Sequence, residues 1–292
     1  MTCKLLHQQY RVQGKLGDAL YGAVLLCQDT LNSNNNNNSN NDNKLVAIKQ
    51  VSLQHARRAL LLNGHMDNPW DELRIMTRVM RLGGHDNILR IRHEFVEKGT
   101  WYVVMDFCDG GDVLDLLHQS PDHRFPEHVA MTLFAQIGQG VHFLHTNGIA
   151  HRDLSLENVL VQNNTCKLCD FGLSTESDRM CSGKVGKAYY MAPEVVAEEE
   201  AYDPAAADMW SLGVMLFIML TGSPLAPSAS VDERGFQALK KFGLRTILRV
   251  WGMDTVMSSG TLELLEGLLQ VDPATRFTIQ DVLRHPVVRN LL

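Results

Sequence analysis

Apolar and polar residues alternate through the first third of the chain, and glycines interrupt the alternation at intervals. The runs at residues 10–17, 21–30 and 45–53 follow this pattern. A period of two residues places successive side chains on opposite faces of a strand, so these runs predict a small antiparallel sheet.

An asparagine-rich tract, residues 32–43, separates the second of these runs from the third and contains no apolar side chain. A segment that has no apolar surface to bury gains little to offset the entropy lost on ordering. We therefore predict a disordered insertion between two strands.

The apolar spacing becomes helical over residues 68–82, and after one more strand pair, which ends near residue 107, helical patterns dominate. The clearest helix ends at Asn147-Gly148, a common helix stop, and its apolar stripe predicts a core-facing side. That stripe consists of Val129, Leu133, Ile137, Val141 and Leu144. The pattern predicts an α+β protein with a small sheet lobe plus one helix, about residues 1–105, a large mainly helical lobe, about residues 109–292, and a cleft between them.

Composition and charge exclude some classes of partner. The chain of 292 residues is 45% hydrophobic, and 27 basic against 33 acidic residues give a net charge of −6. No overall positive field attracts nucleic acid. The longest strongly apolar run, residues 212–220, is too short for a membrane span, and residues 1–10 lack a signal-peptide pattern. We expect an intracellular protein, in the cytoplasm with the nucleus as an alternative, that binds neither nucleic acid nor membrane.

The six cysteines are scattered, apart from one C-x-x-C pair at Cys166 and Cys169. A zinc site needs about four ligands, and positions three apart on a strand point to opposite faces. We interpret these residues as reduced core cysteines, with a zinc site as the alternative.

Short motifs at five places in the chain carry the chemistry. They are LGDALYGAV at 16–24, VAIK at 46–49, HRDLSLEN at 151–158, DFG at 170–172 and APE at 192–194. In this order they resemble the eukaryotic protein kinase family, of the Ser/Thr type that includes calcium/calmodulin-dependent kinases. The resemblance covers nearly the whole chain and implies a bilobal kinase fold, ATP and Mg²⁺ as cofactors, and a protein substrate with a serine or threonine acceptor. The oligomeric state is left open.

The resemblance also implies roles for single residues. Asp153 corresponds to the catalytic base, and Asn158 and Asp170 to the ligands of Mg²⁺. Lys49 corresponds to the lysine that binds the ATP phosphates, with Glu72 as its partner. The implied nucleotide-binding residues are Leu16, Gly17, Gly22, Val24, Ala47, Lys49, Met105, Asp106, Cys108, Asp112, Leu160 and Asp170. A buried structural pair, Glu194 with Arg276, and a brace for the catalytic loop, Asp208, complete the set.

Three positions depart from the family pattern. Ala19 replaces a glycine, Ser155 stands where a lysine neutralises the γ-phosphate, and Lys187 stands where a threonine precedes the APE motif. We hypothesise that Lys187 reaches into the space left at 155 and restores the missing charge, so that the last two departures form one exchange. The alternative is that Lys187 points to solvent and turnover is low.

Two other classes of function stay open. A pseudokinase scaffold would bind nucleotide or partners without efficient transfer, and Ala19, Ser155 and the position of Glu72, about one helical turn farther from His85 than in typical relatives, favour it. A small-molecule kinase is the second, which the protein-docking character of the segment from 170 to 194 disfavours. Lys49, Asp153, Asn158 and Asp170 have no chemical purpose in a scaffold, so the sequence favours the protein kinase.

Overall fold

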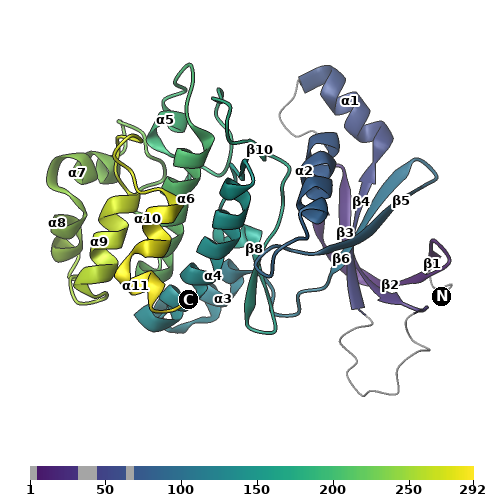
Figure 1. Ribbon diagram of the computed structural model, residues 1–292, viewed down its shortest axis with the longest axis horizontal. Coiled ribbons are helices and arrows are strands. Elements are labelled where there is room, and N and C mark those ends of the chain that lie inside the picture. The colour runs from purple at the N-terminus through teal and green to yellow at the C-terminus, as the bar shows by residue number, and fades with distance from the viewer. Residues whose placement is uncertain (1–4, 32–44, 64–68) are drawn as a thin grey trace. The chain divides into compact units, whose positions relative to one another are not determined.

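The computed structural model describes residues 5–31, 45–63 and 69–292. It divides into two compact units, unit 1 (Met1–Gly84 with Leu89–Asp109) and unit 2 (His85–Ile88 with Gly110–Leu292). Strands dominate unit 1 and helices dominate unit 2, which confirms the predicted α+β fold (Figure 1). The tract predicted to be a disordered insertion, residues 32–43, lies outside the described residues.

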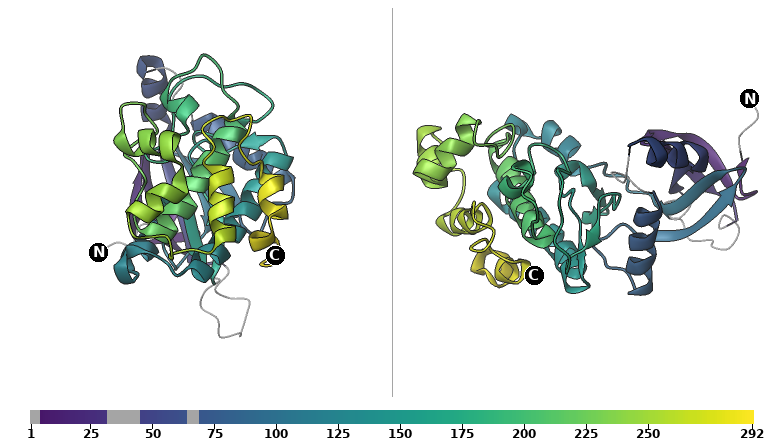
Figure 2. Two further views of the ribbon diagram at one scale, coloured as in Figure 1. Left: turned by 90° about the vertical axis from the view of Figure 1, so that its left-hand side faces the viewer. Right: turned by 90° about the horizontal axis from the view of Figure 1, so that it is seen from above.

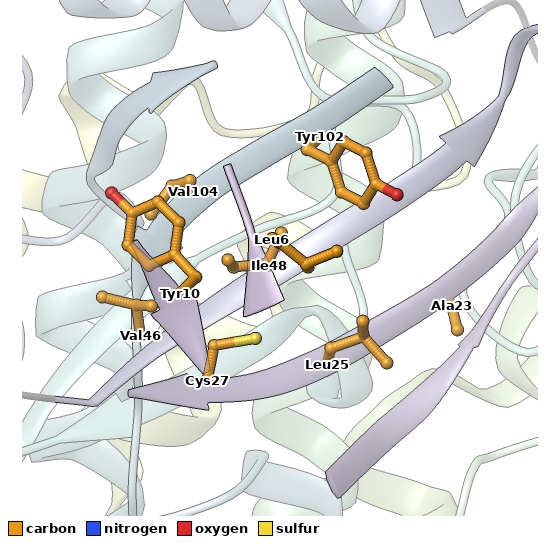
Figure 3. Packing of buried hydrophobic residues seen from close by; sticks show 9 residues of the cluster. All are labelled: Leu6, Tyr10, Ala23, Leu25, Cys27, Val46, Ile48, Tyr102 and Val104. Carbon is orange, nitrogen blue, oxygen red and sulfur yellow. The ribbon is translucent and has the colours of Figure 1, made fainter. Parts of the chain in front are cut away.

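Unit 1 is built on an antiparallel sheet whose described strands have the order β1-β2-β3-β4-β6-β5. The strands are β1 (Leu5–Leu6), β2 (Tyr10–Ala19), β3 (Gly22–Asp29), β4 (Leu45–Ser52), β5 (Ile91–Glu97) and β6 (Thr100–Asp106). Because side chains alternate along each strand, one face of the sheet gathers the apolar core. That core consists of Leu6, Tyr10, Ala23, Leu25, Cys27, Val46, Ile48, Tyr102 and Val104 (Figure 3).

Two helices belong to unit 1, α1 (Leu53–Asn63) and α2 (Pro69–Arg81). Helix α2 corresponds to the predicted helix at 68–82. Proline at its first position, acidic residues in its first turn and basic residues in its last turn all stabilise it. Helix α1 continues directly from β4, with no glycine or proline between them, so no punctuation in the sequence separates it from the strand.

Unit 2 contains the remaining elements of the chain. They are α3 (Val113–Gln119), η3 (Pro121–His123), α4 (Glu127–Thr146), β7 (Ile149–Ala150), η4 (Leu156–Asn158), β8 (Val159–Gln162), β9 (Thr165–Leu168), β10 (Thr175–Glu176), α5 (Pro193–Val196), α6 (Pro204–Thr221), α7 (Arg234–Phe242), α8 (Leu244–Val250), α9 (Ser259–Leu268), α10 (Ile279–Arg284) and α11 (Pro286–Arg289). Helix α4 contacts α6, α10 and α11, and α6 contacts α9. Figure 2 shows α9, α10 and α11 grouped together, in yellow-green to yellow.

Helix α4 ends at Asn147, as the sequence predicts. Its buried face is wider than the predicted stripe, because Ala130, Phe134 and Gly140 are buried while Val129 and Leu133 are only partly so. A Cβ atom at Gly140 would lie 2.8 Å from Leu168 Cδ1. Small residues let neighbouring segments approach this helix closely, and Gly140 in this way leaves space for Leu168 of β9.

Helix α6 is the central apolar helix of unit 2. It is long and apolar enough to cross a membrane by length and composition, but 89% of that window is buried inside the protein. Burial of this kind is typical of the core helix of a globular unit. Its one acidic residue, Asp208, is 1% exposed and belongs to the site described next.

Candidate active site

In unit 1, Lys49 of β4 meets Glu72 of α2. Lys49 Nζ donates to Glu72 Oε1 at 2.6 Å, and the two side chains are 18% and 7% exposed. Charges so far removed from water are stable only when they are paired. The structure thus brings together the two residues that the resemblance implies as partners.

Four predicted nucleotide-binding residues share one face of the unit 1 sheet. Val24 of β3 pairs with Lys49, and Ala47 of β4 pairs with Met105 of β6. The alternation of side chains places these residues on the face opposite the core cluster of Figure 3. Three apolar residues therefore share this face of the sheet with Lys49.

The glycines of the segment 16–24 differ in what they do. Gly22 begins β3, where an added Cβ atom would lie 2.0 Å from the Gln50 carbonyl oxygen, so the sheet itself requires glycine there. At Gly17 a Cβ atom would meet nothing within 4 Å, and Leu16 is 46% exposed. Contacts of Leu16 and Gly17 with a nucleotide stay predictions.

Residues 105–108, which include three of the predicted nucleotide-binding residues, already use one of their backbone N–H groups. Asp106 N–H donates to the Arg90 carbonyl oxygen at 3.0 Å, and its carboxylate accepts from Arg92 Nε at 2.7 Å. Cys108 is 8% exposed. The Asp106 N–H is therefore not the donor that a base would meet.

Asp112 and Leu160, both in unit 2, are joined by an antiparallel bridge. Asp112 Oδ1 accepts from Asp115 N at 2.8 Å and caps α3. Burial raises the pKa of the Asp112 carboxyl above its ordinary value. The resemblance implied only a nucleotide contact for Asp112, and its role as the cap of α3 was missed although Asp is a common cap residue.

Asp153 is the centre of the cluster of predicted site residues in unit 2. Its Oδ2 accepts from Asn158 Nδ2 at 2.7 Å and from Lys187 Nζ at 3.0 Å. Its Oδ1 is buried and has no hydrogen-bond partner within the described residues. A buried oxygen without a donor costs free energy, so this carboxylate is built to accept one more hydrogen bond.

Asp208 of α6 holds the loop that carries Asp153. Its carboxylate accepts from His151 N and Arg152 N, both at 2.7 Å, and lies 2.9 Å from His145 Nε2. Arg152 has a positive φ of 64°, a conformation that needs such support in a non-glycine residue. The predicted brace is thus present, and it fixes the backbone one residue before Asp153.

Asn158 and Asp170 supply oxygen donors of the kind that Mg²⁺ prefers. Asn158 Nδ2 donates two hydrogen bonds to Asp153, at 2.8 Å to the carbonyl oxygen and at 2.7 Å to Oδ2, which leaves the amide oxygen of Asn158 as the atom for a cation. Cys169 N, beside Asp170, donates to Asn158 O at 3.0 Å, so the two ligand candidates are tied through the backbone. Their donor set fits a hard divalent cation.

Lys187 and Ser155 meet as the exchange hypothesis requires. Lys187 Nζ donates to Ser155 Oγ at 2.9 Å while it also contacts Asp153. The Lys187 side chain is 35% exposed, and Ser155 is 0% exposed. The ammonium group therefore points inward to the catalytic loop and not to solvent.

Arg152 has a partner that the sequence did not indicate. Its Nη2 donates to the Tyr202 hydroxyl at 2.8 Å, and its guanidinium lies 5.9 Å from the centroid of that ring. Tyr202 also exchanges two backbone hydrogen bonds of 2.8 Å with Cys181. Tyr202 thus joins the catalytic loop to the segment between the DFG and APE motifs, and nothing in its sequence context distinguishes it.

Comparison with known proteins gives one family. The chain matches the family described as protein kinase domain over residues 10–288. It is 29% identical over 293 residues to serine/threonine-protein kinase chk1 of Schizosaccharomyces pombe, with 98% of this chain and 54% of that protein covered. It is 31% identical over 290 residues to calcium-dependent protein kinase 22 of Oryza sativa subsp. japonica, with 97% and 46% covered. It is 30% identical over 291 residues to probable serine/threonine-protein kinase fhkC of Dictyostelium discoideum, with 97% and 45% covered. The chain spans about half the length of these relatives.

Proposed function

The chain belongs to the protein kinase family, and from that premise we propose that it transfers the γ-phosphate of Mg-ATP to a serine or threonine hydroxyl of a protein substrate. The proposal rests on the Asp153 carboxylate. Its Oδ2 accepts hydrogen bonds from two donors, and its buried Oδ1 has no hydrogen-bond donor within the described residues. The names of the relatives from Schizosaccharomyces pombe and Dictyostelium discoideum, both serine/threonine-protein kinases, support the serine or threonine acceptor.

The proposed step needs a base and an aligned hydroxyl. The hydroxyl oxygen of the substrate attacks the γ-phosphorus, and the bond from that phosphorus to the β–γ bridging oxygen breaks, so that ADP leaves with the bonding electrons. The hydroxyl proton passes to Asp153 Oδ1, the carboxylate oxygen that has no hydrogen-bond donor within the described residues. Because Asn158 holds Oδ2 at 2.7 Å, the carboxylate is oriented before the substrate arrives.

Other residues hold the nucleotide. Lys49, fixed by Glu72 at 2.6 Å, supplies a cation for the ATP phosphates. The oxygens of Asn158 and Asp170 would hold Mg²⁺, which when bound neutralises charge on the transferring phosphoryl group. A scaffold without transfer would need neither the oriented Asp153 nor the paired Lys49, and their contacts weigh against the pseudokinase alternative.

The proposal is tested by transfer of radiolabelled phosphate from ATP to a degenerate peptide library. We expect labelling of serine or threonine, and a loss of at least about 100-fold in Asp153→Asn, since general bases contribute about 10²–10⁴. Asn at 153 keeps the shape of the side chain and removes the proton acceptor. Asp178→Asn, a change at an exposed residue of the neighbouring segment, serves as the matched control. Equal labelling by wild type and Asp153→Asn would contradict the proposal.

A further inference from the structure

Lys187 is the one cation whose ammonium group contacts both Asp153 and Ser155 within the described residues. We propose that this ammonium group is a catalytic group that neutralises charge on the transferring phosphoryl group, in the place that Ser155 leaves empty. The inference rests on the proposed kinase activity and adds a residue to it. It assigns to the segment between DFG and APE a charge that the resemblance expects on the catalytic loop.

The chemistry at Asp153 requires a cation nearby. A carboxylate that accepts the proton of the hydroxyl must lie close to a phosphoryl group that is itself anionic, and the two negative groups repel each other. Phosphoryl transfer is accelerated mainly by positioning and by neutralisation of this charge. Lys187 Nζ, 3.0 Å from Asp153 Oδ2, is placed to reduce that repulsion.

The position of the ammonium group is fixed at both ends of its side chain. The Lys187 carbonyl oxygen accepts from Tyr190 N at 2.9 Å and from Met191 N at 3.2 Å, which closes a turn. Ser211 Oγ donates to the Tyr190 carbonyl oxygen at 2.7 Å and attaches this turn to α6. A charge held in place before the substrate binds is effective because little reorganisation is needed in the transition state.

Gly186 lets the turn come close to the catalytic loop. Its φ of +98° is a conformation that L side chains rarely adopt, and an added Cβ atom would lie 3.0 Å from the Arg152 carbonyl oxygen. The backbone at 186 therefore passes directly beside the residue before Asp153. Asp153, Gly186 and Lys187 line one pocket of unit 2.

Ser155 is the counterpart that makes room for this arrangement. It is 0% exposed, and its hydroxyl accepts one of the hydrogen bonds of Lys187. A lysine at 155 would have to direct its own ammonium group to the space that the Lys187 ammonium group occupies. Positions 155 and 187 thus share a single charge.

Four variants test the exchange: Lys187→Thr, Ser155→Lys, the double variant Ser155→Lys/Lys187→Thr, and Lys184→Thr. Lys184 is an exposed lysine of the same segment, so Lys184→Thr is a matched control for which wild-type turnover is expected. We expect Lys187→Thr to lower kcat by at least about tenfold, which is about 1.4 kcal/mol in barrier. The double variant should regain at least about a third of wild-type kcat, since it returns one cation to the site.

Two further readouts separate a direct effect on phosphate from weaker roles. ATP hydrolysis without peptide should fall by a similar factor in Lys187→Thr, whereas a residue that only docks the peptide would leave it unchanged. In an Asp153→Asn background Lys187→Thr should lower the residual rate again, whereas a residue that acts only by orienting Asp153 would cause no second loss. Thermal melting of each variant monitors folding.

The outcomes are distinct. Transfer by wild type with a loss below tenfold in Lys187→Thr, or a double variant no faster than Lys187→Thr, would overturn the exchange and leave the proposed function intact. Absence of any transfer by wild type above the Asp153→Asn level would overturn the proposed function itself, and the exchange with it. A regained kcat in the double variant supports the exchange even where Lys187→Thr alone lowers the melting temperature.

Discussion

Two of the pairs that a basic side chain makes with a carboxylate in unit 2 differ in how completely their atoms are bonded. Arg276 and Glu194 are 0% and 2% exposed, and two guanidinium nitrogens contact the two carboxylate oxygens at 2.7 and 3.0 Å. Arg276 also donates to the carbonyl oxygens of Gln270, Ala206 and Val271. Lys187 and Asp153 are 35% and 15% exposed, and Asp153 Oδ1 lacks a hydrogen-bond partner within the described residues.

The difference distinguishes a pair that stabilises the structure from a pair that can take part in the reaction. A pair in which every polar atom is bonded resists any new ligand, and removal of one member leaves a buried charge alone. A pair that keeps one buried oxygen without a donor is less stable than it could be, but that oxygen can bind a substrate group. We expect substitutions in the first pair to lower stability and substitutions in the second to lower turnover.

We call Arg276 with Glu194 the closed pair, because every polar side-chain atom in it is bonded, and Lys187 with Asp153 the open pair. The largest effect is expected at the closed pair. Arg276→Met should lower the free energy of unfolding by about 3–5 kcal/mol, because Glu194 then stays buried without its partner. Denaturant unfolding measures this. The matched control is Arg245→Met, since Arg245 contacts Glu266 at 3.3 Å with 54% of its side chain exposed, and a change of about 1 kcal/mol or less is expected there. Equal losses in the two variants would remove the distinction between closed and open pairs.

Lys49 and Glu72, 18% and 7% exposed, form an intermediate case between these pairs. Glu72→Gln should lower kcat/KM for ATP by about tenfold or more, since Lys49 loses the carboxylate that positions it. The neighbouring Asp71→Asn is the control, because Asp71 is 51% exposed and lies 3.8 Å from Arg74. Steady-state kinetics with varied ATP concentration measures this change. Unchanged kinetics in Glu72→Gln would mean that this pair stabilises the structure, as the closed pair does, and does not support turnover.

A smaller effect is expected at Tyr190, whose backbone N–H donates to the carbonyl oxygen of Lys187 in the open pair. Its hydroxyl donates to Glu157 Oε2 at 3.1 Å, and burial raises the pKa of this phenol. Tyr190→Phe should lower stability by about 0.5–1.5 kcal/mol and kcat by less than tenfold, because its backbone N–H still bonds Lys187. Tyr189→Phe, at a side chain that is 52% exposed, should change neither quantity. A tenfold loss of kcat in Tyr190→Phe would mean that the phenol itself takes part in the open pair.

The smallest effect concerns a pair far from either site, the Thr278–Asp281 capping box at the start of α10. Hydrogen bonds from the side chain and backbone of Thr278 lower the pKa of the Asp281 carboxyl below its ordinary 3.8. A carboxyl with a lowered pKa in the folded state stabilises the fold above its ordinary pKa, and the contribution is lost as the pH falls through the folded pKa. Asp281→Ala should therefore cost about 0.5–1 kcal/mol near pH 7 and less below pH 3.8. Gln280→Ala, at the exposed preceding position, is the control, and a cost independent of pH would exclude the carboxylate as its source.

Local patterns sufficed for much of the fold. The alternation of apolar and polar residues predicted the strands of unit 1, and the helical spacing over residues 68–82 predicted α2. Helix α1 was not predicted, because no glycine or proline separates Leu53 from the preceding strand β4. The packed face of α4 was predicted too narrow, since small residues such as Ala130 carry no apolar signal of their own.

The sequence predicted those parts of the site that depend on the identity of single residues. Two unusual identities, Ser155 and Lys187, were enough to suggest a contact across the chain, although the distance between them comes from the structure. The contact of Tyr202 with Arg152 and the cap that Asp112 makes on α3 depend on tertiary packing and on backbone direction. Residue identity alone does not contain that information.

The contact between Lys187 and Ser155 also restricts how this sequence can evolve. A lysine introduced at 155 alone places two cations beside one carboxylate, and loss of Lys187 alone leaves none, so each single step disturbs the site. Because both residues contact each other at 2.9 Å, the route between the two arrangements is a paired substitution. We therefore expect positions 155 and 187 to change together across species that share this segment, as compensating sites do.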